Sequence, residues 1–147
     1  MQDFVHLHVH TQYSLLDGQA SVARLVDKAM KNGMKGIAVT DHGNMFGIKE
    51  FTNYVNKKNS GPKGEVKDLK KRIAGIEAGT IECEDKEAEI AACKAKIVEA
   101  ENKLFKPIIG CEMYVARRTM DLKEGKPDQS GYHLIVLAKN ETGYHNL

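Results

Sequence analysis

Three histidines alternate with aliphatic residues near the start of the chain, in the segment FVHLHVHTQYSLLDG over residues 4–18. Alternation is the period of a β-strand, so we expect His6, His8 and His10 to share one face of a strand. Asp17 follows in the adjoining loop. A row of imidazoles makes a poor core, but imidazoles beside carboxylates are typical ligands of Zn²⁺, Mn²⁺ or iron. The segment therefore indicates half of a metal site.

The other half is predicted from residues at the ends of later apolar runs. Asp41 and His42 follow GIAVT, Glu112 follows PIIGC, and His133 begins HLIVLA. Proteins with parallel strands bind ligands at the carboxyl ends of those strands. His133 lies at the opposite end of its strand, but a hairpin between EMYVA and YHLIVLA would return it to Glu112. Such a set suits a multi-metal hydrolytic site, where two ions about 3.5–4 Å apart hold a bridging hydroxide and clamp a phosphate diester.

Each of these pieces also has an ordinary structural explanation. A histidine pair on a strand can be packing, TDHG can be a turn with a helix cap, and Glu112 can be a charge at a strand end. The recurrence of metal-binding types at successive strand ends favours the metal site. For His6, which lies nearer the start of the strand, packing or hydrogen bonding is the favoured interpretation. We therefore assign His6 as a group beside the ligands and not as a ligand. Asp41, which directly precedes His42, is assigned the same supporting role.

Helices and strands alternate in the pattern that would position these residues. A strand is predicted over residues 4–10 and another over Ile37 to Val39. Between them, Ser21 can cap a helix that has an apolar stripe and ends at Asn32-Gly33. Asn44 is the predicted cap of a second helix, and Thr142 that of a helix that stops within its first turn. The alternation predicts a parallel α/β sheet or barrel, and the interrupted last helix suggests a fragment.

The segment from about residue 57 to 103 differs, because it is densely charged and poor in aromatic residues. Two heptad seams predict an antiparallel helical hairpin with helices at about 65–78 and 84–104. The contacts would join one set of apolar side chains to another, namely Val66, Leu69, Ile73 and Ile76 to Ile90, Ile97 and Leu104. A solvated charged insertion is the ordinary interpretation, and an arm that binds a partner or a second copy is the alternative.

Composition excludes several classes of protein. The net charge of +2 is too small to indicate nucleic-acid binding by itself, and 41% apolar residues with 29% charged residues are typical of a globular domain. No apolar run approaches the roughly 20 residues of a membrane span. Cys83, Cys93 and Cys111 lack metal-type spacing, which favours free thiols in a cytoplasmic protein.

Four motifs together resemble a known family. HLHVHTQYSLLDG, AVTDHGNMFG, KPIIGCEMYVA and HLIVLAKNETGYHNL are similar, in order and wording, to the amino-terminal PHP (polymerase and histidinol phosphatase) domain of bacterial DNA polymerase III alpha subunits. The resemblance covers Asp3 to about Asn56 and Phe105 to Leu147. It implies a fold of the α/β class, namely part of a distorted (β/α)7 barrel of the PHP type. Residues 1–58 would form its first part, 59–104 an inserted charged helical hairpin, and 105–147 a continuation that is cut off before the domain ends.

The resemblance also implies a metal cluster at the strand ends. Its ligands within this chain would be His8, His10, Asp17, His42, Glu112 and His133. The ions would be Zn or Mn, with Mg or Fe as alternatives, and a metal-bound hydroxide would be the nucleophile, so no side chain here is assigned as catalytic. The family pattern continues with a cysteine and an Asp-x-His pair, so the site would be incomplete in a fragment.

The resemblance implies a replicative DNA polymerase, a nucleotidyltransferase for DNA-directed DNA synthesis. Its PHP domain would support the polymerase structurally and, as a metal-dependent phosphoesterase fold, would act as a proofreading 3′–5′ exonuclease. The polymerase residues would lie outside these 147 residues. DNA and other replicase subunits would be its partners, and no membrane association is expected. The fragment alone would be inactive and prone to self-association. The alternatives are a stand-alone PHP phosphoesterase acting on a small phosphate ester, and a non-catalytic scaffold. The length of the gene distinguishes the stand-alone phosphoesterase from the polymerase, because only the polymerase gene is much longer than this chain. Metal content distinguishes the non-catalytic scaffold from both.

Overall fold

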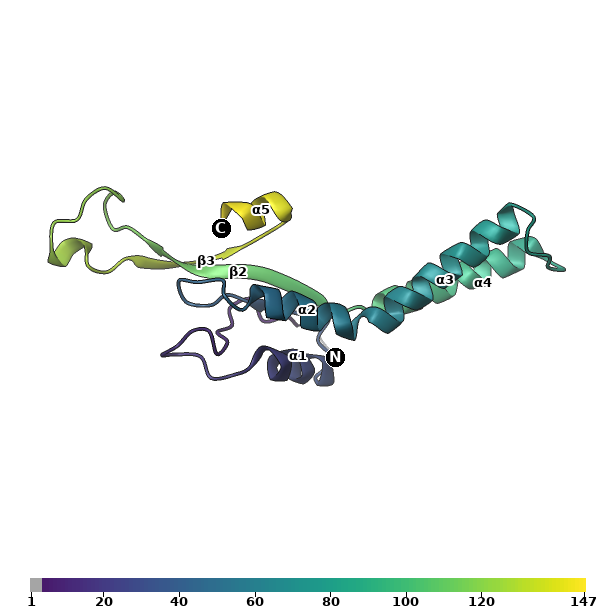
Figure 1. The fold of residues 1–147 in the computed structure, drawn as a ribbon, viewed down its shortest axis with the longest axis horizontal. Coiled ribbons are helices and arrows are strands. Elements are labelled where there is room, and N and C mark those ends of the chain that lie inside the picture. The colour runs from purple at the N-terminus through teal and green to yellow at the C-terminus, as the bar shows by residue number, and fades with distance from the viewer. Residues whose placement is uncertain (1–3) are drawn as a thin grey trace. The chain divides into compact units, whose positions relative to one another are not determined.

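The computed structural model describes residues 4–147 (Figure 1). Asp3, where the family resemblance begins, and the first residues of the predicted domain lie outside that range. The described elements, in chain order, are α1 Val22–Lys31, β1 Gly36–Val39, α2 Ile48–Lys58, α3 Ser60–Glu77, α4 Lys86–Asn102, β2 Lys106–Val115, the 3₁₀ helix η1 Lys126–Asp128, β3 Tyr132–Leu137 and α5 Glu141–Asn146. They fall into two compact units. The first comprises the described residues up to Val55 together with Lys106–Leu147, and the second comprises Asn56–Phe105.

The first unit is built on a mixed three-stranded sheet in the order β1-β2-β3. β1 pairs in parallel with β2, with Gly36 opposite Lys106 and Val39 opposite Ile109. β2 pairs antiparallel with β3, and the two long strands lie side by side in Figure 1. The predicted α/β class is confirmed at this level, and the predicted hairpin between β2 and β3 is present.

The predicted strand over residues 4–10 is wrong as a regular strand. This segment lies beside β1, where the Ala38 N–H donates to the His6 carbonyl at 2.9 Å and the Thr40 N–H donates to the Val9 carbonyl at 2.9 Å. However, the chain bends at residues 7–8. The Val9 N–H donates to the Thr40 hydroxyl at 2.9 Å and not to a backbone carbonyl, so a side chain replaces part of the strand ladder.

The core of this unit consists of β1 and one face of each flanking helix. All four residues of β1 are buried. α1 buries Val22, Val26 and Ala29, which recur at helical spacing, and it packs against β1. α2 buries Ile48, Phe51 and Val55. The polar residues that follow β1 are therefore attached to a buried apolar layer.

Two of the predicted helix caps are correct and two are wrong. Ser21 stands at the N-cap of α1, although its side chain makes no capping hydrogen bond, and Gly33 follows the helix with a φ of 76°. The Asn44 side chain accepts from the Phe46 N–H in a loop turn, and α2 begins only at Ile48. At the last helix, Asn140 and not Thr142 is the cap, because its side chain accepts from the Gly143 N–H at 2.9 Å.

The second unit is the predicted antiparallel hairpin, with α3 beginning earlier than expected, at Ser60. α3 and α4 pack against each other. The seven predicted contact residues are all buried or half-buried, with Ile76 and Ile97 buried. Asp85 caps α4 by accepting from the Ala88 N–H at 3.0 Å.

A buried amide closes the base of the hairpin. The Asn59 side chain accepts from the Phe105 N–H at 2.9 Å and donates to the Phe105 carbonyl at 2.8 Å. Asn59 is 5% exposed and Phe105 is 3% exposed, so both bonds are shielded from water. No helix within residues 4–147 combines the length and the apolar character that a membrane span requires.

Candidate metal centre

Backbone pairing beyond the end of β1 places His42 beside Glu112. The two residues form an isolated parallel bridge. The Gly43 N–H donates to the Glu112 carbonyl at 2.9 Å, and the Glu112 N–H donates to the Asp41 carbonyl at 3.1 Å. Residues that are far apart in sequence are therefore held in register by main-chain hydrogen bonds, which do not depend on any side chain of the site.

Asp41 organises the loop that carries Asp17. Asp41 is 1% exposed, and its Oδ1 accepts from the Thr11 N–H at 2.6 Å and from the Ser14 hydroxyl at 2.7 Å. Its Oδ2 accepts from the Thr11 hydroxyl at 2.8 Å. The Ser14 oxygen in turn accepts from the His42 N–H at 3.0 Å. A buried carboxylate with this many donors anchors the loop between His10 and Asp17 to the end of β1.

Glu112 stands between two histidines of the first segment. Its Oε2 lies 3.2 Å from His8 Nε2 and 2.5 Å from His10 Nε2. The two Nε2 atoms are 3.2 Å apart. The three side chains therefore converge on one point, and all the ligand atoms of this group lie within 4.8 Å of one another.

Two further groups of the same kind share members with the first. In one, Asp17 Oδ2 lies 3.3 Å from both His10 Nδ1 and His42 Nδ1. In the other, Glu112 Oε1 lies 2.8 Å from His133 Nδ1, while Glu112 Oε2 lies 3.4 Å from His42 Nδ1. The sharing of His10, His42 and Glu112 links the three groups into one cluster, which we call the histidine–carboxylate cluster. It contains all six of the predicted ligands, namely His8, His10, Asp17, His42, Glu112 and His133.

The electrostatics of Glu112 suit a ligand. Burial raises the pKa of its carboxyl group, but hydrogen bonds from His133, His8 and His10 outweigh burial and lower the pKa from 4.5 to about 2. Glu112 is 7% exposed, so this ionised carboxylate is largely withdrawn from water. A negative charge in that position favours bound cations.

His42 supplies the clearest test of whether a cation fits. Within residues 4–147, its Nδ1 is the buried side-chain nitrogen or oxygen atom that lacks a hydrogen-bond partner. It faces Asp17 Oδ2 and Glu112 Oε2 without hydrogen-bond geometry. A ring nitrogen that faces two carboxylate oxygens without bonding to them is the arrangement that a bound cation would complete. The donor set of imidazoles and carboxylates suits Zn²⁺, Mn²⁺ or iron.

The two predicted supporting residues differ in their placement. Asp41 contacts the loop and lies outside the three ligand groups. His6 is exposed, and its ring packs at right angles on Phe4 with a centroid distance of 4.8 Å, so it does not belong to the cluster. Tyr114 was not predicted, yet its hydroxyl contacts His42 Nε2. The period of a strand could have found it, since Tyr114 follows Glu112 by two residues and so shares its face.

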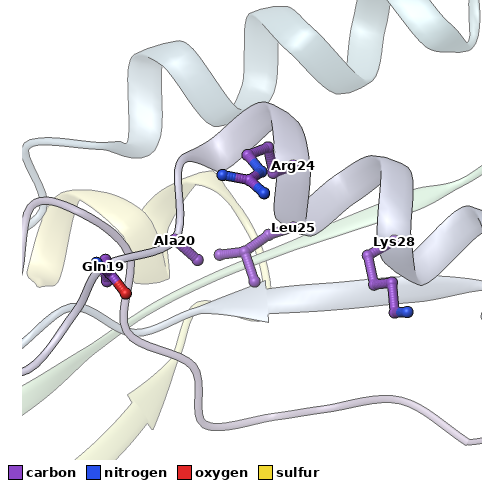
Figure 2. A pocket seen from close by; sticks show the side chains of 5 residues that line it. All are labelled: Gln19, Ala20, Arg24, Leu25 and Lys28. Atoms are coloured by element: carbon purple, nitrogen blue, oxygen red, sulfur yellow. The ribbon is translucent and has the colours of Figure 1, made fainter.

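Two surface pockets in this unit differ in the side chains that line them. One, of about 460 Å³, adjoins the cluster, with His42 and Asp17 in its wall beside Leu15, Leu16 and Phe46. The other lies along α1 and the loop before it (Figure 2) and is lined by Gln19, Ala20, Arg24, Leu25 and Lys28. Among the described residues, the second lining contains no histidine or carboxylate and carries two cationic side chains, so it is unsuited to a metal ion.

Comparison with known proteins agrees with this geometry. The PHP domain family model matches residues 6–97 and 87–147. The DNA polymerase III subunit alpha of Treponema pallidum is 40% identical over 145 residues, and that of Borreliella burgdorferi is 40% identical over 147 residues, each match covering 98% of this chain. The corresponding protein of Aquifex aeolicus is 32% identical over 152 residues.

These alignments run across the hairpin as well as the sheet, because they cover 98 to 99% of this chain. The chain spans only 8 to 9% of the length of these curated relatives. The family match extends over most of the chain and includes every residue of the histidine–carboxylate cluster. The chain therefore belongs to the PHP domain family.

Proposed function

We propose that the histidine–carboxylate cluster binds divalent metal ions and hydrolyses phosphodiester bonds at the 3′ end of DNA, as part of a DNA polymerase III alpha subunit. The observation that carries this proposal is the sharing of His10, His42 and Glu112 among three ligand groups. Shared ligands bring neighbouring ions close together, and closely spaced ions suit a phosphate diester, whose attacking and leaving oxygens both carry negative charge.

In this proposal the side chains of the cluster are ligands and not nucleophiles. Bound divalent ions would supply positive charge for the phosphate oxygens and lower the pKa of a water molecule. Glu112 holds its negative charge at low exposure, between the imidazoles of His10 and His133. Asp41 holds the loop of Asp17 in place through Thr11 and Ser14. The protein thus contributes orientation and electrostatics to the reaction.

The names of the relatives support a role of this domain in DNA replication. They are DNA polymerase III alpha subunits, so we infer that this domain serves DNA-directed DNA synthesis in the bacterial cytoplasm, with DNA and other replicase subunits as partners. We infer also that the three strands belong to a distorted (β/α)7 barrel, that residues 59–104 are an insertion in it, and that the polymerase residues lie outside these 147 residues.

Metal titration of the chain with Zn²⁺ and Mn²⁺, for wild type and His10→Ala, tests the ligand assignment. His10 belongs to two of the three groups, so its loss should weaken binding by more than the roughly 10–100-fold that loss of a partner of a ligand costs. Matched His6→Ala should leave the affinity unchanged, because its ring packs on Phe4 outside the cluster. Equal affinities of wild type and His10→Ala would contradict the assignment.

The proposed hydrolysis of DNA is tested in a full-length DNA polymerase III alpha subunit that contains this domain. Its single-stranded DNA substrate is labelled at the 5′ end, so that shortening from the 3′ end is visible. His10→Ala should abolish metal-dependent shortening and leave primer extension intact. Shortening at the wild-type rate would place that activity elsewhere. Hydrolysis of p-nitrophenyl phosphate without any shortening of DNA would favour a phosphoesterase that acts on small esters.

A further inference from the structure

We propose that Tyr114 is a positioning residue that fixes the His42 ring, so that Nδ1 and not Nε2 is the atom offered to a metal ion. The inference rests on the metal-binding half of the proposed function, but it does not depend on which phosphate ester is cleaved. Three observations carry it: the hydroxyl contact to His42, the space that Gly43 leaves for the tyrosine ring, and the unpaired Nδ1 atom on the opposite side of the imidazole.

The first observation is the contact between the two rings. Tyr114 stands on β2 opposite His133 of β3, and its hydroxyl contacts His42 Nε2. The two ring centroids are 4.9 Å apart at an interplanar angle of 73°. Tyr114 also packs against His133 at 5.1 Å. The tyrosine thus contacts two cluster histidines and holds the outer nitrogen of one of them.

The second observation concerns the residue after His42. A Cβ atom on Gly43 would lie 2.7 Å from Cε2 of Tyr114, closer than non-bonded carbon atoms approach each other. Gly43 also has a φ of +65°, where side chains other than glycine are disfavoured. The glycine therefore admits the tyrosine ring beside His42.

The third observation concerns the nitrogen on the opposite side of the His42 ring. His42 Nδ1 is buried and has no hydrogen-bond partner, and it faces the carboxylates of Asp17 and Glu112. In a neutral imidazole one nitrogen carries the proton and the other carries a lone pair. If Nε2–H donates to the Tyr114 oxygen, the lone pair remains on Nδ1 and points toward the site. Metal-binding histidines commonly donate their other N–H in this way, which orients the ring.

The tautomer is measured directly on the metal-free chain, from the ring ¹⁵N chemical shifts of His42 at a pH where the imidazole is neutral. Wild type should show the Nε2–H form. Tyr114→Phe should lower the population of that form, while Tyr132→Phe, which removes a hydroxyl from the neighbouring strand, should not. A wild-type His42 with its proton on Nδ1, or a tautomer unaffected by Tyr114→Phe, would overturn the proposal.

Metal binding provides the second readout. Tyr114→Phe should weaken Zn²⁺ or Mn²⁺ binding by about 10–100-fold, the usual consequence of losing a partner of a metal-binding histidine. Tyr132→Phe should stay within about twofold of wild type. Because phenylalanine keeps the ring and its packing, a lost hydroxyl is the sole chemical difference. Unchanged affinity in Tyr114→Phe would show that the hydroxyl does not position His42, whereas His10→Ala would still report separately whether the cluster binds metal.

Discussion

The histidine–carboxylate cluster and the helical hairpin are assembled in opposite ways. The six cluster residues come from four separate stretches between His8 and His133, and they meet because main-chain pairing joins β1 to β2 and β2 to β3. The hairpin is made by two consecutive helices whose apolar seams follow helical spacing. The cluster therefore depends on contacts that are distant in sequence, and the hairpin mostly on local ones.

The two regions also differ in what stabilises them. Around the cluster, specific partners satisfy the buried polar groups other than His42 Nδ1, with Asp41 as the main acceptor. In the hairpin, the buried side chains are mostly apolar, and an ion pair such as Arg72–Glu89 at 2.8 Å lies on its surface. Exposed ion pairs contribute little, about 0–1 kcal/mol. Removal of a polar side chain should thus destabilise the unit that contains the cluster more than the hairpin.

The largest effect is expected from Asp41→Ala. The change leaves the Thr11 N–H and the hydroxyls of Thr11 and Ser14 without their buried acceptor, and we expect a loss of about 3 kcal/mol in the free energy of unfolding. Because the loop of Asp17 is then released, metal affinity should fall as well. Urea denaturation and metal titration measure the two effects. Asp121→Ala, in the exposed β2–β3 loop, is the control, and equal stability of both variants would refute the role given to Asp41.

Acid should destabilise the unit that contains the cluster through Glu112. Its folded pKa is lowered from 4.5 to about 2, so the unfolded carboxyl binds a proton at a higher pH than the folded one. The stabilisation is complete above about pH 4.5 and is lost as the pH falls toward 2. The shift corresponds to a few kcal/mol, roughly 3.

Chemical denaturation of the metal-free chain at several pH values measures this dependence. Glu112→Gln should be less stable near neutral pH and should show a flatter dependence between about pH 4.5 and 2. Parallel curves for the two proteins would contradict the assignment of this acid sensitivity to Glu112.

A smaller effect, confined to the hairpin, is expected from Asn59→Ala. Both backbone groups of Phe105 lose their buried partner, which should cost about 2 kcal/mol. Hydrogen exchange in α3 and α4 should become faster, while metal affinity stays constant. Asn53→Ala, at an exposed position of α2, is the matched control. A metal affinity that falls together with hairpin protection would show that the two regions are not independent.

Removal of the hairpin should likewise have little effect on the metal affinity of the cluster. A short Gly/Ser linker in place of residues 60–102 removes α3 and α4, but it leaves all six cluster residues in the chain. Metal affinity should remain within about threefold of wild type, and circular dichroism should lose only the helical signal of the hairpin. An unfolded product would show that the hairpin is part of the core and not an insertion.

Sequence alone determined what depends on neighbouring residues. The stripe of Val22, Val26 and Ala29 with Gly33 after it specified α1, and the heptad seams specified the hairpin. Both follow from spacing along one helix. The cap predictions at Asn44 and Thr142 failed because asparagine side chains compete for nearby amides: Asn44 binds the Phe46 N–H, and Asn140 caps α5.

Tertiary structure decided how the predicted ligands meet and what holds them. The segment of residues 4–10 is not a strand, since the Thr40 hydroxyl takes the Val9 N–H, yet His8 and His10 still point to the same place. Local spacing places Tyr114 on the same strand face as Glu112. It predicts neither the contact of Tyr114 with His42 nor the loop contacts of Asp41. Such contacts join residues from different stretches of the chain. Their geometry is set only when strand register and burial fix which side chains face each other.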